Sequence, residues 1–188
     1  VDIAALNEPS QITVSGDQSA VEAVIEKIQS AGKKAKRLQV SHAFHSAHME
    51  PMLEAFEAVV STASFSPPAI PIVSNRTGAV ATDEALCSPA YWVGQVRDAV
   101  RFAQGVQCLS ENGVRTFVEC GPGGALCALA ANTLEDPSLH LIASLRKGAA
   151  EEQTLMAALG RVFSSGHKVD WDAVYAGVSL PRVELPLY

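Results

Sequence analysis

The chain has 188 residues, the length of one ordinary domain. Hydrophobic residues make up 48% of it and charged residues 18%, proportions typical of a globular protein with a sizeable core. Its formal net charge of −6 argues against nucleic acid as a partner, because phosphate binding needs a basic surface.

The sequence also indicates the compartment. No stretch approaches the roughly 20 apolar residues that cross a bilayer, so we expect no membrane partner. No basic region followed by an apolar segment marks a secretory signal. Three of the four cysteines lie in apolar stretches, as reduced cysteines do, and we expect a cytoplasmic protein. The chain opens on an apolar run and closes without a stop signal of its own, so we expect it to be part of something longer.

Residues 1–41 are predicted to form strand, strand, helix and strand. Gln11 to Ser15 is rich in β-forming residues and is followed by Asp17, a good helix cap. Four apolar side chains then recur at helical spacing and the helix should stop at Gly32; they are Val21, Val24, Ile25 and Ile28. Lys36 to Val40 alternates charged and apolar residues, which is typical of a half-buried strand. The pattern is one half of a ferredoxin-like unit.

Residues 42–146 alternate between strand-like and helix-like stretches. Such alternation predicts a parallel sheet covered on both faces. The expected elements are a helix capped by Ser46, a short buried strand at 70–74 closed by a turn at 75–78, helical stretches after Pro89 and from Phe102 to Asn112-Gly113, a strand at 116–120, a glycine turn at 121–124, a helix at 125–133 and a last strand at 140–143. After residue 147 an apolar-faced helix around Leu155 should lead into an extended tail.

The densest group of reactive side chains is residues 41–48, which contain His42, His45 and His48 at a spacing of three. A zinc site is disfavoured because no Cys, Asp or Glu completes a ligand set at the usual spacing. A general-base histidine is more plausible, since imidazole titrates near neutral pH. The structural alternative is that these histidines only cap a helix or fill a crevice. The G-x-S-x-G elbow that presents a nucleophilic serine does not occur in the chain.

The run Val40-Ser41-His42-Ala43-Phe44-His45-Ser46 resembles the acyltransferase domains of modular polyketide synthases. Similar motifs follow in order along nearly the whole chain, at residues 5–10, 14–17, 71–78, 91–93, 100–102 and 119–123. The resemblance implies an α/β fold in three segments: the latter part of a small ferredoxin-like (α+β) subdomain at 1–41, the C-terminal part of an α/β-hydrolase-like parallel-sheet subdomain at 42–146, and a post-acyltransferase linker at 147–188. Leu185-Pro186-Leu187-Tyr188 stands where that linker usually carries a Leu-Pro-x-Tyr pattern.

The resemblance also implies the chemistry. Members of the family use a Ser–His dyad to move a malonyl unit from malonyl-CoA, through a serine ester, to the phosphopantetheine thiol of an acyl carrier protein. His45 matches the dyad histidine, and a backbone carbonyl expected at Gln95 should orient its ring. His42 and Phe44 match the positions that track extender-unit choice, with Phe44 filling the space of a methylmalonyl methyl. Asn7 is expected to line the cleft between subdomains.

The resemblance finally implies what else is needed. The nucleophilic serine belongs to the preceding half of such a domain, which we expect as a partner, together with the carrier protein and the adjacent ketosynthase. No tightly bound cofactor or metal is expected. Two alternatives remain: a non-catalytic docking or structural module of a polyketide synthase, and a fragment of a stand-alone fatty-acid malonyl transacylase.

Overall fold

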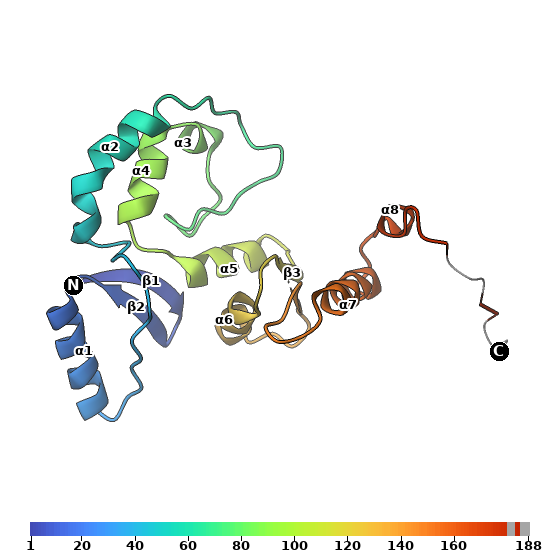
Figure 1. Cartoon of the computed structure of the whole chain (residues 1–188), viewed down its shortest axis with the longest axis horizontal. Helices are drawn as coiled ribbons and strands as arrows, with labels where there is room; N and C mark the ends of the chain where they lie inside the picture. The colour runs from blue at the N-terminus through green and yellow to red at the C-terminus, as the bar shows by residue number, and fades with distance from the viewer. Residues whose placement is uncertain (180–182, 185–188) are drawn as a thin grey trace. The chain divides into compact units, whose positions relative to one another are not determined.

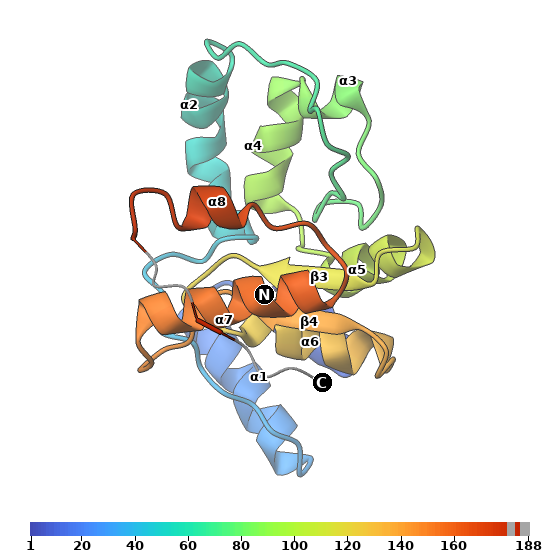
Figure 2. The same cartoon turned by 90° about the vertical axis from the view of Figure 1, so that its right-hand side faces the viewer.

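The computed structural model describes residues 1–179 and 183–184. They form two compact units. The first joins residues 1–117 to 125–141, and the second joins residues 118–124 to the described residues from 142 onward. Figures 1 and 2 show the elements of each unit in two perpendicular views. The division of the chain at residues 41 and 146 stays a prediction.

The first unit opens with a β-hairpin and a helix. Strand β1 (Asp2–Glu8) pairs antiparallel with β2 (Gln11–Ser15), and helix α1 (Gln18–Ser30) follows. The Asp17 carboxylate accepts hydrogen bonds from the backbone N–H groups of Ser19 and Ala20, at 3.0 and 3.3 Å. The predicted strand, cap and helix are therefore confirmed.

The strand predicted at Lys36 to Val40 is wrong. Residues 33–40 have no regular secondary structure, and the side chains of Leu38 and Val40 are 55% and 72% exposed. An open groove of about 680 Å³ is lined by residues 37–41. A strand forms only where a neighbour supplies its hydrogen-bond partners, and the hairpin sheet holds β1 and β2 alone.

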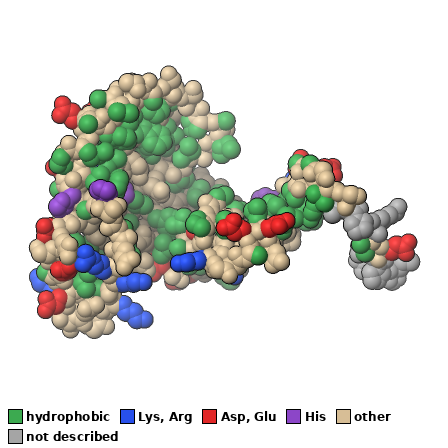
Figure 3. Space-filling model, in the orientation of Figure 1, with side chains coloured by type: hydrophobic (Ala, Val, Ile, Leu, Met, Phe, Trp, Pro, Cys, Tyr) green, Lys and Arg blue, Asp and Glu red, His purple; other side chains and the backbone are tan. Residues whose placement is uncertain are grey.

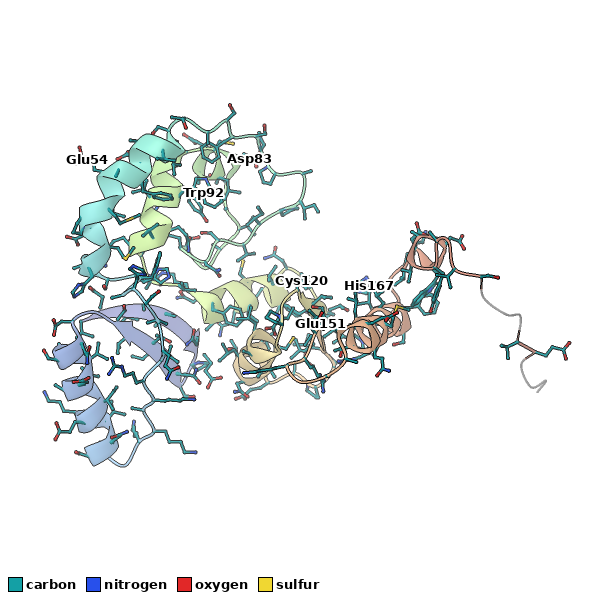
Figure 4. The ribbon with its side chains drawn as sticks, viewed as in Figure 1. Glu54, Asp83, Trp92, Cys120, Glu151 and His167 are labelled. Atoms are coloured by element: carbon teal, nitrogen blue, oxygen red, sulfur yellow. The ribbon has the colours of Figure 1, made fainter. Side chains whose placement is uncertain are left out.

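Three helices pack beyond the histidine-bearing segment. A short 3₁₀ turn (Ala47–Met49) runs into α2 (Glu50–Val60), and α3 (Asp83–Leu86) precedes α4 (Pro89–Arg97). Helices α2 and α4 lie side by side in Figures 1 and 2. Trp92 of α4 stacks on Phe65, with ring centroids 6.2 Å apart, and its indole N–H donates to the Leu86 carbonyl at 2.9 Å (Figure 4).

The buried strand predicted at Ile70 to Ser74 is also wrong. Only Val73 forms a β-bridge, with Val80, while Ile70 and Ile72 are 76% and 43% exposed. The chain folds back on itself here, so this segment bonds to residues 79–81 and has no neighbouring strand. The turn expected after Ser74 is confirmed: Gly78 donates to the Ser74 carbonyl at 2.7 Å and has a φ of 73°, which suits glycine.

Two further helices complete the first unit. Helix α5 (Phe102–Glu111) stops at Asn112, and α6 (Ala125–Leu134) packs against both α5 and β1. Both agree with the predicted helices. Val100, just before α5, bridges to Ala5 of β1, which attaches the end of α4 to the hairpin.

Strands β3 (Thr116–Glu119) and β4 (His140–Ala143) form a two-stranded parallel sheet. His140 donates to the Arg115 carbonyl and Ser144 to that of Glu119, at 2.9 and 3.0 Å. The predicted α/β class is confirmed, and the described residues form one parallel and one antiparallel sheet. Ile142 of β4 is 1% exposed and Val118 of β3 is 45% exposed, and the cover expected on both faces of the sheet stays a prediction.

The second unit contains helices α7 (Glu151–Ser164) and α8 (Trp171–Val174). The apolar-faced helix around Leu155 is confirmed by α7, whereas α8 interrupts the predicted extended tail. The Leu185 to Tyr188 pattern lies outside the described residues. Within the described part of the chain, no helix is long and apolar enough to span a bilayer.

Candidate active site

Ser46 shapes the backbone around the histidines. Its side chain is completely buried, its hydroxyl donates to the Ala43 carbonyl at 2.7 Å, and the same oxygen accepts from the His48 N–H at 3.3 Å. One residue thus closes the loop before it and caps the helical turn after it. The predicted cap is confirmed, and residues 43–48 form a tight corner at the start of α2.

His45 occupies a strained position in this corner. Its φ is 60°, in the left-handed region that few non-glycine residues adopt, although histidine does so more often than most. Its backbone N–H donates to the Val96 carbonyl at 3.1 Å. Its ring Nδ1 lies 2.7 Å from the Asp98 carbonyl oxygen. Strain of this kind persists only where the surroundings hold it, and it is common at functional sites.

The end of α4 supplies both of these acceptors. The helix ends at Arg97, so the last carbonyls of the helix have no partner within it. Val96 offers one of them to the His45 backbone, and Asp98, which is extended, offers its own carbonyl to the ring. A carbonyl oxygen can only accept, so Nδ1 carries the proton. The other ring nitrogen, Nε2, is then the basic one.

The expected role of Gln95 is therefore corrected. The carbonyl that meets the imidazole belongs to Asp98, three residues further along the chain. Gln95 lies within α4, one residue before the Val96 carbonyl that meets the His45 backbone, whereas Asp98 has left the helix with a ψ of 153° and presents its carbonyl to the ring. A backbone carbonyl does contact the His45 ring, as expected, but it belongs to Asp98.

His42 and Phe44 lie next to His45, as their spacing suggests. The Phe44 ring is 6.4 Å from that of His42 and 6.3 Å from that of His45, and its side chain is 48% exposed. His42 Nδ1 lies 3.0 Å from the hydroxyl of Ser41. Figure 3 shows histidine side chains at the surface near the start of α2. The structure thus brings three of the predicted site residues together.

Asn7 stands apart from this group. Its amide donates to the Thr13 hydroxyl on β2 at 3.0 Å, so its partner lies within the hairpin. In the part of the chain that the structure describes, no hydrogen bond links Asn7 to His45. Its place in a substrate cleft stays a prediction.

The glycine turn after β3 is closed by a side chain of its own unit. Gly121 donates to the hydroxyl of Ser144 at 3.2 Å, which closes the turn after β3. Among residues 1–179 and 183–184, no three His, Cys, Asp or Glu side chains gather as metal ligands. None of the four cysteines, all of which lie in the described part of the chain, forms a disulfide.

A second brace holds the corner from the β1 side, and no sequence signal predicted it. The Asp2 carboxylate accepts from the Ala47 N–H at 3.0 Å and pairs with Arg97 at 3.5 Å. Arg97 also pairs with Glu50 at 3.1 Å. The Ala47 hydrogen bond, aided by Arg97, lowers the pKa of Asp2 below its usual value. The start of β1, the corner and the end of α4 therefore share one charged network.

Asp2→Asn is expected to flatten the acid dependence of stability. A carboxyl with a lowered folded-state pKa stabilises the fold above its ordinary pKa near 3.8, and this contribution is lost as the pH falls below that value. Urea unfolding at about pH 6 should give a higher free energy of unfolding for wild type than for the variant, and this difference should become smaller at about pH 3. Glu54→Gln, which changes an exposed carboxylate on α2, is the control (Figure 4). If wild type and variant differed by the same free energy of unfolding at both pH values, the role of Asp2 would be contradicted.

Known proteins share this arrangement of elements. A family model described as an acyl transferase domain matches residues 1–169. Polyketide synthase GfsA of Streptomyces halstedii is 46% identical over 189 aligned positions, which cover 100% of this chain and 2% of that protein. The acyltransferase domain from the second module of the salinomycin polyketide synthase has a TM-score of 0.87 and 45% identity. That match covers 96% of this chain and 43% of the other.

A more distant structure is also similar. It is a complex of a type II PKS acyl-carrier protein with its malonyl-transacylase, with a TM-score of 0.72, 28% identity, and coverage of 84% of this chain and 49% of that one. The chain thus spans less than half of each solved chain and a small fraction of GfsA. Because the family match extends over residues 1–169 of the 188, the chain belongs to the acyl transferase domain family.

Proposed function

We propose that this chain supplies the general-base histidine of an acyltransferase that loads malonyl units onto an acyl carrier protein for polyketide synthesis. The observation that carries the proposal is the 2.7 Å contact between His45 Nδ1 and the Asp98 carbonyl. It fixes the tautomer whose Nε2 accepts a proton. Membership of the acyl transferase family and the polyketide synthase relatives support the reaction class.

In the first half-reaction, His45 Nε2 takes the proton of a serine hydroxyl while the oxygen attacks the thioester carbonyl of malonyl-CoA. The coenzyme A thiolate leaves and receives that proton, and a malonyl–serine ester remains. In the second half-reaction, Nε2 takes the proton of the phosphopantetheine thiol, the sulfur attacks the ester, and the proton returns to the serine. Each half-reaction thus begins and ends with a neutral ring.

The carbonyl partner has a chemical consequence. A carboxylate in the place of the Asp98 carbonyl would add a full negative charge beside the imidazolium that forms in each step. A carbonyl fixes the ring orientation without that charge, so the base should be activated less strongly. Attack on a thioester is also less demanding than attack on an amide, and a moderately activated base suits the proposed substrate.

The serine and the partners lie outside this chain in the proposal. We propose that the preceding half of the domain contributes the nucleophile, that malonyl-CoA is the donor, and that a carrier protein with its phosphopantetheine arm is the acceptor. The likeness to a malonyl-transacylase solved with its carrier protein supports this acceptor. We further propose a neighbouring ketosynthase as a partner of residues 147–188. No tightly bound cofactor is required, since both half-reactions need only proton transfer and acyl exchange.

The test is a transfer assay with the complete domain, in which this chain follows its preceding half. Malonyl-CoA and a carrier protein bearing phosphopantetheine are added, and the mass of the carrier protein is followed. Malonylation of the carrier at a rate well above the protein-free reaction is expected. A carrier protein that stays unmodified would contradict the proposal and favour a docking or structural module.

A further inference from the structure

Asp98 makes two contacts that point in different directions. Its backbone carbonyl accepts from the His45 ring at 2.7 Å, and its carboxylate forms an ion pair with the Nε of Arg76. Asp98 therefore contacts the imidazole through its backbone and Arg76 through its side chain. Both contacts lie in the first unit of the chain.

Arg76 is held along one face of α4. Tyr91, Gly94 and Asp98 follow one another at i, i+3 and i+7, so they lie on the same side of the helix and its end. The Arg76 guanidinium carbon is 5.9 Å from the centroid of the Tyr91 ring, a cation–π distance. Gly94 leaves room for the guanidinium, because a Cβ at this position would collide with it.

The turn that carries Arg76 is itself anchored. The buried Ser74 hydroxyl lies 2.6 Å from the Tyr91 hydroxyl and accepts from the Arg76 backbone N–H at 3.1 Å. The Asn75 carbonyl accepts from the N–H of Arg101 at 2.7 Å. The turn is therefore attached to both ends of the 98–101 segment. The Arg76 side chain contacts Asp98, and the Asn75 backbone contacts Arg101.

We propose that Arg76 is a positioning residue for the catalytic histidine, acting through Asp98. The inference rests on the proposed function, since it assumes that the orientation of His45 matters for acyl transfer. Both partners of the ion pair are about one-third or more exposed, at 34% and 43%, so the pair contributes little to overall stability. Its effect should appear in the geometry of the ring, because a displacement of the peptide moves the carbonyl.

The kinetic test uses the complete domain and removes either partner of the ion pair. Arg76→Met removes the cation, and Asp98→Asn removes the charge while keeping the carbonyl. Each should lower kcat of malonyl transfer by about tenfold with little change in KM for malonyl-CoA, because small misplacements of a catalytic group cost about 10- to 100-fold. The double variant should be no slower than either single one, since both break the same contact. Arg76→Lys should restore part of the rate.

A further variant leaves every charge in place. Gly94→Ala puts a methyl group where the guanidinium now lies, and should lower kcat in the same way as Arg76→Met. Alanine has a higher helix propensity than glycine, so a lower kcat in this variant would not result from destabilisation of α4. The matched control is Arg37→Met, which breaks the exposed Arg37–Glu22 pair at 3.1 Å and should leave kcat unchanged.

A second readout does not depend on activity. Proton NMR of the complete domain, labelled with ¹⁵N-histidine, should show a slowly exchanging Nδ1 proton on His45 that broadens or disappears in Arg76→Met and stays in Arg37→Met. Wild-type kcat and an unchanged Nδ1 resonance in Arg76→Met would overturn the role of Arg76 even if His45→Ala is inactive. A fully active His45→Ala would instead overturn the proposed function, and the resonance would still report whether Arg76 orients the ring.

Discussion

His45→Ala in the complete domain is expected to lower the rate of malonyl loading by about 10³-fold or more, since a positioned general base contributes about 10²- to 10⁴-fold. The imidazole is the group whose Nδ1 is tied to the Asp98 carbonyl and whose Nε2 is basic. Binding of malonyl-CoA should be little affected, so the loss should appear in kcat. Rapid-quench measurement of the malonyl–enzyme provides the check.

His48→Ala is the matched control for that variant. His48 lies three residues away in the same corner, but its side chain is exposed and its contact to Ser46 is made by the backbone N–H. Loading by this variant should remain close to that of wild type. A similar loss in both variants would mean that the corner had been disrupted, and near-normal loading by His45→Ala would refute the dyad assignment.

Phe44→Ser is expected to raise the use of methylmalonyl-CoA relative to malonyl-CoA by about tenfold, because one methyl group in an apolar pocket decides about 1–3 kcal/mol. The Phe44 ring lies 6.3 Å from the His45 ring, close enough for its bulk to limit what stands beside the base. A serine leaves that volume empty. Competition between the two thioesters, read from the mass of the acyl–enzyme, gives the ratio.

Phe44→Leu separates volume from the loss of the aromatic ring. Leucine keeps an apolar side chain of considerable size, so this variant should retain most of the malonyl preference. An unchanged ratio in Phe44→Ser would count against the steric role of Phe44. It would favour a packing role next to His42, whose ring meets Phe44 edge-on.

The helices could be predicted from the sequence more safely than the strands. Helices α1 and α5 satisfy their hydrogen bonds internally, so the spacing of Val21, Val24 and Ile28 or of Phe102 and Val106 already defines them. The alternation from Lys36 to Val40 describes a strand equally well, yet a strand needs a neighbour that the pattern does not reveal. The same limit applies to Ile70 to Ser74, which forms hydrogen bonds with residues 79–81 just after it in the chain.

The candidate site divides in a similar way. His42, Phe44 and His45 could be found because side chains carry the chemistry and a short motif holds them together. The partner of the imidazole could not be predicted in the same way, because every residue has a backbone carbonyl. Which carbonyl accepts from the ring depends on where α4 ends. The Arg76–Asp98 pair spans 22 residues and the Asp2–Arg97 pair 95, so neither leaves a local pattern.

The most direct measurement is intact-mass spectrometry after incubation with malonyl-CoA, performed on this chain alone and on this chain together with the preceding half of the domain. We expect a malonyl adduct only when both parts are present, located on a serine of the preceding half, because His45 provides the base and this chain lacks a G-x-S-x-G elbow. A stable malonyl adduct on this chain alone, or no adduct under either condition, would contradict the assignment of His45 as the base of a shared Ser–His dyad.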